Sequence, residues 1–177
     1  MKKTVITFGL IAGAIMALMM LLTMPFQDRI GFDKGAIIGY TTMVLSGLMI
    51  FFGVKSYRDN EAGGKISFGK AFQVGFLIAL ISAVCYVVTW EFIYFKLMPD
   101  FWDKYSAYAI EKARLSGATP ESVQANIDQM KKLKEYFDNP IYNAAITLIE
   151  PLPAGLLMTL LSAAILRRPV KSLDSKL

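Results

Sequence analysis

Long, mainly apolar segments alternate with charged ones along the chain. A helix needs about 20 mainly apolar residues to cross about 30 Å of hydrocarbon. Four segments meet this requirement, namely residues 4–24, 36–54, 71–95 and 144–166, each bound given to within a few residues. The pattern predicts an all-α integral membrane protein with four transmembrane helices, in a single membrane domain covering residues 1–177.

The connection between the third and fourth predicted spans carries two amphipathic patterns. Aromatic residues recur at helical spacing in its first half, at Phe101, Trp102, Tyr105 and Tyr108. An apolar stripe follows in its second half, at Val123, Ile127, Met130, Leu133 and Phe137. Gly117-Ala118 separates the patterns, and Thr119 before Pro120 is a helix start signal. We expect an amphipathic helical hairpin over residues 99–138, with its stripes buried on each other or on the membrane surface.

Lysine and arginine near the span ends predict the orientation. They cluster at both termini and in the second connection, at Lys2, Lys3, Lys55, Arg58, Lys65, Lys70, Arg167, Arg168, Lys171 and Lys176. The first and third connections carry balanced charges. By the positive-inside rule, both termini are cytoplasmic and the hairpin is extracytoplasmic. An aromatic belt is then expected at the outer interface, formed by Trp90, Tyr94, Phe95 and Trp102.

Composition excludes several kinds of chemistry. The chain has no histidine and a single cysteine, Cys85, so it lacks the commonest general base and cannot form an internal disulfide or a cysteine metal cluster. The net charge of +5 lies beside the predicted spans, where orientation explains it without nucleic acid. We predict no cofactor, no metal and no nucleic-acid partner.

Small residues repeat every four positions in three of the predicted spans. The series are Gly9, Gly13 and Ala17; Gly75, Ala79 and Ala83; and Gly155, Thr159 and Ala163. Such spacing lets helix backbones approach closely in a membrane. The series serve either packing inside one protomer or a dimer seam, and the sequence leaves both open.

The second connection contains a glycine- and lysine-rich motif. Residues 64–70 match G-x-x-x-x-G-K, but Ala71 replaces the hydroxyl residue of a P-loop and no strand precedes the motif. A turn at Gly63-Gly64 and a helix cap at Ser67 explain it better. Candidate contacts to lipid headgroups or a partner are Arg58, Lys65 and Lys70.

Glu91 and Glu150 are the only acids inside the predicted spans. A charge at the bilayer centre costs about 2.5–3.5 kcal/mol on insertion scales, so such residues face the bundle interior or the headgroups. Both acids are expected at similar depth in the outer half, and Pro151 and Pro153 weaken the fourth helix nearby. The pair is a candidate polar intramembrane site, with local structural contacts as the alternative.

Several motifs resemble the bacterial four-span family catalogued as domain of unknown function 4199. They are residues 57–61 (YRDNE), 63–72 (GGKISFGKAF), 139–144 (NPIYNA), 150–153 (EPLP) and 166–168 (LRR). The resemblance covers nearly the whole chain. It implies a multi-pass protein of the bacterial inner membrane and brings no activity with it.

We expect a non-enzymatic accessory, scaffold or envelope component. The alternative is a small oligomeric transporter or ion pathway that uses Glu91 and Glu150. An intramembrane enzyme ranks third, because without histidine it would need a carboxylate mechanism and no second catalytic cluster is visible. The expected partners are membrane lipid and either a second copy of the chain or another membrane protein.

Overall fold

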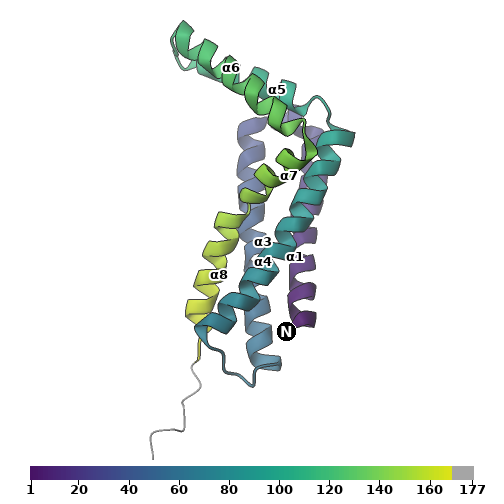
Figure 1. The fold of residues 1–177 in the computed structure, drawn as a ribbon, viewed down its shortest axis with the longest axis vertical. Coiled ribbons are helices and arrows are strands. Elements are labelled where there is room, and N and C mark those ends of the chain that lie inside the picture. The colour runs from purple at the N-terminus through teal and green to yellow at the C-terminus, as the bar shows by residue number, and fades with distance from the viewer. Residues whose placement is uncertain (169–177) are drawn as a thin grey trace, which may run out of the picture.

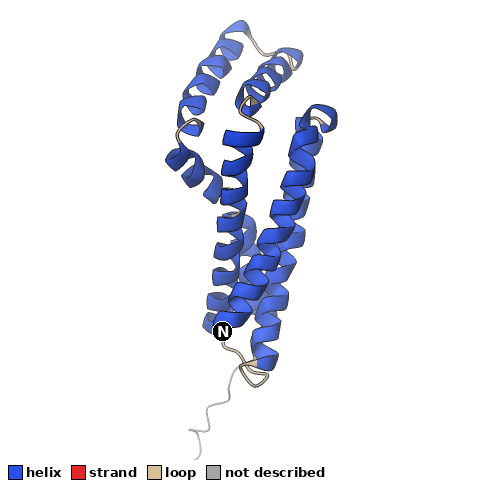
Figure 2. Ribbon diagram, turned by 90° about the vertical axis from the view of Figure 1, so that its right-hand side faces the viewer, coloured by secondary structure: helices blue, strands red, loops and turns tan. Residues whose placement is uncertain are grey.

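The computed structural model describes residues 1–168 and consists of long helices packed side by side, with a helical hairpin across one end (Figure 1). The elements in chain order are α1 (Lys2–Thr23), η1 (Met24–Phe26), α2 (Gln27–Ile30), α3 (Phe32–Asn60), α4 (Phe68–Phe92), the π-helical η2 (Ile93–Leu97), α5 (Phe101–Leu115), α6 (Pro120–Phe137), α7 (Pro140–Ile149) and α8 (Leu152–Leu166). Figure 2 shows helices joined by short loops throughout the described part.

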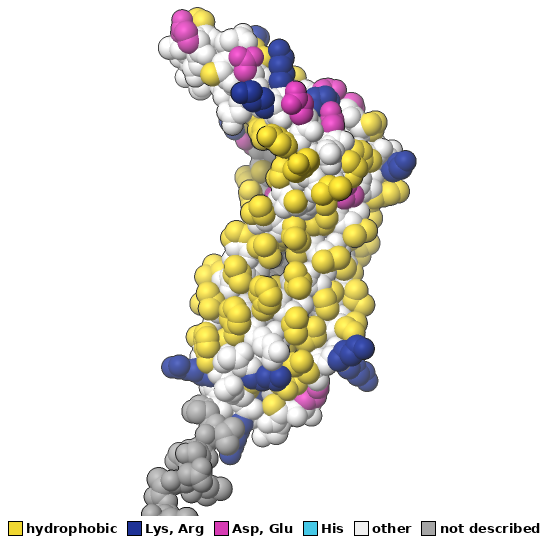
Figure 3. All heavy atoms as spheres, in the orientation of Figure 1, with side chains coloured by type: hydrophobic (Ala, Val, Ile, Leu, Met, Phe, Trp, Pro, Cys, Tyr) yellow, Lys and Arg dark blue, Asp and Glu magenta, His cyan; other side chains and the backbone are white. Residues whose placement is uncertain are grey.

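Four helical stretches are long and apolar enough to cross a membrane. They are Lys2–Ile30, Phe32–Asn60, Phe68–Leu97 and Pro140–Leu166. On the face that Figure 3 shows, apolar side chains cover the middle of the bundle, with lysines and arginines at one end and mixed charges on the hairpin at the other. The all-α membrane fold is therefore confirmed. We call the end that holds the N-terminus and the α3–α4 connection the basic end, and the opposite end the hairpin end.

Local signals in the sequence set the helix boundaries. The Ser67 hydroxyl accepts a hydrogen bond from the Lys70 N–H at 3.3 Å and caps α4, as predicted. The Thr119 hydroxyl accepts one from the Ser122 N–H at 3.3 Å and caps α6. Gly117, with φ of 79°, makes the turn between α5 and α6, because that backbone conformation is strained for other residues. The predicted helical hairpin is confirmed.

The fourth span is broken into two helices at Glu150 and Pro151. Helix α7 ends at Ile149 and α8 begins at Leu152. Proline carries no N–H, so Pro151 and Pro153 interrupt the ladder of backbone hydrogen bonds. The sequence predicted a weakened helix here, and the structure resolves it into a joint that holds Glu150.

The small-residue series pack inside the protomer. A Cβ built on Gly13 would lie 2.5 Å from the Cys85 Cβ, and one built on Gly155 would lie 3.2 Å from the Ala79 Cβ. Helix α1 thus packs closely on α4, and α4 packs closely on α8. A core at the basic end includes Ile50, Val54 and Ile78, each at most 2% exposed.

Candidate functional site

A cavity of about 570 Å³ lies beneath the hairpin, among α1, α3, α4 and α7. Apolar and aromatic side chains make most of its wall, and methionines from four elements contribute, among them Met16, Met20, Met43 and Met130. Cavities that hold drug-sized ligands measure about 300–1,000 Å³ and have mainly apolar walls with a few polar groups. The cavity has the size and character of such a site.

The hairpin is held over the cavity by ion pairs and aromatic packing. Lys104 Nζ lies 2.8 Å from an Asp28 carboxylate oxygen, and Lys112 Nζ lies 2.6 Å from one of Asp33. The hydrogen bond to Asp33 raises the pKa of Lys112 above its ordinary value. The ring of Phe32 packs on three aromatic rings of α5, with centroids 4.9–5.9 Å away. These contacts dock the hairpin on α2 and the start of α3.

Both tryptophans of the cavity wall donate hydrogen bonds within the protein, and Asn143 links Trp90 to the backbone. Trp90 donates its indole N–H to the Asn143 side-chain oxygen at 2.9 Å, and the Asn143 amide donates to the Phe137 carbonyl at 2.9 Å. Trp102 donates to the Met130 carbonyl at 3.1 Å. Asn143 is fully buried, and all its bonds lie within the protein.

The aromatic belt predicted at the interface is wrong for three of its four members. Trp90, Tyr94 and Trp102 are at most 7% exposed, so their rings are buried in the protein instead of lying among headgroups. The polar groups of these side chains donate hydrogen bonds to the hairpin and to α7. At the membrane interface they would bond water instead. The rings form a core that joins α4 to the hairpin.

Glu150 lies on the cavity wall at the joint between α7 and α8. Its Oε2 accepts a hydrogen bond from the Tyr86 hydroxyl at 2.7 Å, across to α4. Within residues 1–168, Glu150 is the one acidic or basic residue that lines the cavity. Glu150 is exposed, and the Tyr86 hydroxyl is its hydrogen-bond donor among the described residues.

The cavity opens to the surroundings between α3 and α7. Tyr40 of α3 and Ile149 of α7 both line it, and they are 60% and 64% exposed. Side chains that line a cavity and also face outward mark its mouth. The mouth lies within two of the membrane-spanning stretches, so it faces the lipid side of the bundle.

The other predicted acid, Glu91, is not part of the cavity wall. It is half-buried near the end of α4, and its Oε1 is enclosed without a hydrogen-bond partner among the described residues. The structure thus brings Glu150 to the cavity and leaves Glu91 outside it. Sequence reasoning missed Tyr86, although a hydroxyl inside an apolar span is a signal that would have found it.

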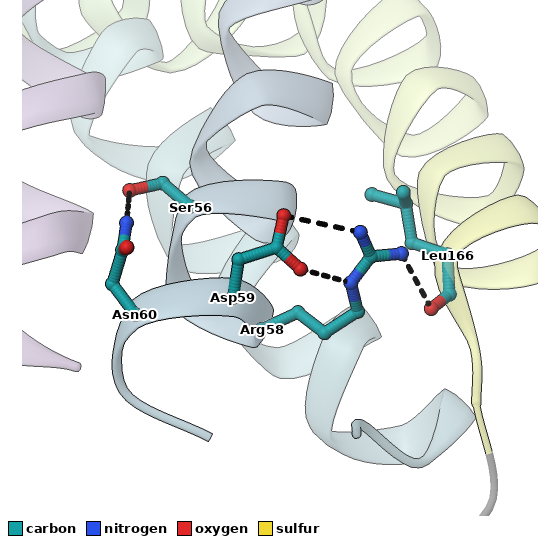
Figure 4. Close-up of polar contacts among 5 residues, drawn as sticks. All are labelled: Ser56, Arg58, Asp59, Asn60 and Leu166. Carbon is teal, nitrogen blue, oxygen red and sulfur yellow. Dashed lines mark hydrogen bonds and ion pairs between the residues drawn. The ribbon is translucent and has the colours of Figure 1, made fainter. Parts of the chain in front are cut away.

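Arg58 is engaged inside the protein at the basic end (Figure 4). It is 7% exposed, bonds both carboxylate oxygens of Asp59 at 2.7 and 3.1 Å, and donates to the Leu166 carbonyl at 3.5 Å. The structure therefore gives Arg58 the role of tying α3 to the end of α8. Lys65 is exposed and Lys70 bonds the Gln73 side chain at 2.9 Å, and their contact with headgroups stays a prediction.

Comparison with known proteins gives a family and no function. The model of the family described as "Protein of unknown function (DUF4199)" matches residues 7–168, nearly the whole chain. Neither the curated proteins nor the solved structures include a significant match to it.

Proposed function

We propose that this chain, which belongs to the DUF4199 family, is a non-enzymatic accessory protein of the bacterial inner membrane that binds an amphiphilic molecule beneath its hairpin. The observation that carries the proposal is the apolar cavity of about 570 Å³ with a mouth between α3 and α7. A ligand dissolved in the bilayer can enter such a mouth without crossing water. Methionine side chains adapt their shape, which suits a wall that accepts more than one ligand.

The hydroxyls of two threonines in the wall, Thr42 and Thr147, fit binding better than nucleophilic catalysis. The Thr42 hydroxyl donates to the Ile38 carbonyl at 2.8 Å, and that of Thr147 donates to Asn143 at 3.1 Å. A nucleophile needs a base within hydrogen-bond reach to become reactive. These hydroxyls are instead engaged in bonds to neighbours that are not bases.

The position of the cavity also favours a ligand-binding function and disfavours an ion pathway. A pathway needs polar groups from one membrane face to the other. The cavity lies at the hairpin end, and the packed core at the basic end includes Val54, Val74 and Ile78, each with no exposed surface. Glu91 and Glu150 do not share one cavity, which removes the geometric support for a two-carboxylate relay.

We also propose that the basic end faces the cytoplasm. The support is its charge, since Lys2, Lys3, Lys55, Lys65 and Lys70 all lie near this end. In a Cys85→Ser background, K65C and E121C should react with a membrane-impermeant thiol reagent from opposite sides. Both positions are exposed, and labelling from one side would refute the orientation.

Ligand entry can be measured with the protein's own tryptophans. The chain has two, Trp90 and Trp102, and both line the cavity. In lipid nanodiscs, 12-bromododecanol should quench their fluorescence in a saturable way, because bromine quenches tryptophan on contact. Saturation identifies a binding site, because quenching by probe dissolved in the bulk lipid keeps rising with probe concentration and shows no plateau at the affinity of a site.

Two matched glycine variants make the test specific. Gly39 is an exposed residue of the cavity wall, and a Cβ built there meets nothing within 4 Å, so Gly39→Leu adds a side chain to the wall without a clash. Gly69 is equally open but lies at the basic end of α4. We expect G39L to weaken binding about tenfold or more, or about 1.4 kcal/mol, and G69L to leave it unchanged. Equal quenching in all three proteins would refute the proposal.

A further inference from the structure

The cavity wall has one acidic side chain and no basic one to balance it. Glu150 is the acidic lining residue, and no lysine or arginine lines the cavity within residues 1–168. Oε2 accepts the Tyr86 hydrogen bond, whereas no side chain or backbone group of the described part donates to Oε1. An ionised carboxylate in an apolar wall is stabilised by an opposite charge brought in by a ligand.

Aromatic rings line the same cavity as Glu150. Tyr86 and Trp90 of α4 line the cavity wall, and Tyr40 lines it on the α3 side of the mouth. The faces of these rings attract cations within about 6 Å, most strongly where water is excluded. Carboxylate and rings together favour a positive head over a neutral or negative one.

We propose that the ligand is a lipophilic monocation, an amine or quaternary ammonium on an apolar body. This inference rests on the proposed binding function and adds the ligand's charge. A phosphate-bearing head is disfavoured, because it would meet Glu150 and find no basic side chain on the wall. A drug-sized body fits the volume of about 570 Å³, and its apolar part lies against Met16, Met20 and Met43.

Three probes that share one chain and differ in the head test the inference. They are 12-bromododecylamine, 12-bromododecanol and 12-bromododecanoate, compared in nanodiscs at neutral pH through quenching of Trp90 and Trp102. We expect the amine to bind at least about tenfold more tightly than the alcohol, and the carboxylate to bind most weakly. Each affinity is corrected for the probe's partition into protein-free nanodiscs.

Glu150→Gln and Glu91→Gln separate the cavity charge from charge in general. Glutamine keeps the size of the side chain and can still accept the Tyr86 hydrogen bond. E150Q should remove the amine preference, and E91Q, whose site lies outside the cavity wall, should retain it. Equal saturable binding of all three probes to the unmodified protein would overturn the cation inference and leave the binding function standing. An amine preference that survives E150Q would also overturn it, and absence of saturable quenching by any probe would overturn both.

Discussion

Replacement of Gly13 by alanine should destabilise the bundle, because α1 and α4 are closest there. The added Cβ would lie 2.5 Å from the Cys85 Cβ and 2.7 Å from its Sγ. Carbon atoms pack best at about 3.5–4.0 Å, so the helices must separate locally by about 1 Å. A radial gap of that size forfeits a quarter to a half of the dispersion attraction across the contact.

The magnitude follows from overpacking, which costs about 1–3 kcal/mol. Alanine's higher helix propensity offsets less than about 1 kcal/mol of this. Gly39→Ala, also within a helix, is the matched control, since its Cβ meets nothing within 4 Å, and its unfolding free energy should stay unchanged or rise by up to about 1 kcal/mol. Unfolding is followed by far-ultraviolet circular dichroism as dodecyl sulfate is added to mild-detergent micelles.

A second substitution tests the cause directly. Cys85→Gly removes the Cβ and Sγ that the new methyl group would strike. The double variant G13A/C85G should therefore be more stable than the sum of the single changes predicts, by about 1 kcal/mol or more. Additive free energies, or a G13A protein as stable as G39A, would refute close packing of α1 on α4.

Three further predictions concern contacts that hold the ends of the bundle. Arg58→Met should lower the unfolding free energy by about 1–3 kcal/mol, whereas Lys65→Met, at an exposed position, should change it little. Asn143→Leu should cost about 1–3 kcal/mol for each partner left unpaired and should shift tryptophan emission, since Trp90 loses its acceptor. Hairpin docking, measured by spin-label distances, should weaken in high salt, which screens the exposed Lys112–Asp33 pair. Because the pKa of Lys112 is raised, the contribution of this ion pair to docking is complete below the ordinary lysine pKa and is lost only as pH rises through the elevated pKa. Docking that weakens between pH 7 and 9 would therefore contradict this pairing.

Local patterns in the sequence predict most of the fold. The four apolar runs and the Thr119 and Ser67 caps act over a few neighbouring residues, so they can be identified without tertiary information. The helices extend beyond the apolar runs, as in α3, which continues to Asn60 through charged residues. Charged side chains end an apolar run in the sequence, but they do not end the helix.

The cavity could not be predicted because it depends on how distant elements pack. Glu150 was identified as an intramembrane acid, yet its partner Tyr86 lies 64 positions away and was not considered. Glu91 shares the residue type and the expected depth of Glu150, but it does not line the cavity. Arg58 looks like a headgroup contact in the sequence, and the Leu166 carbonyl that it bonds is 108 positions along the chain.

Native mass spectrometry of protein released from its own membranes tests the central claim most directly. The unmodified chain and G69L should carry a bound small molecule that survives mild detergent, and G39L should have lost it, because only its new side chain is added to the cavity wall. The released compound should be an apolar cation of drug-like mass. Three proteins with identical spectra, all free of ligand or all carrying the same one, would contradict the assignment of the cavity as a binding site.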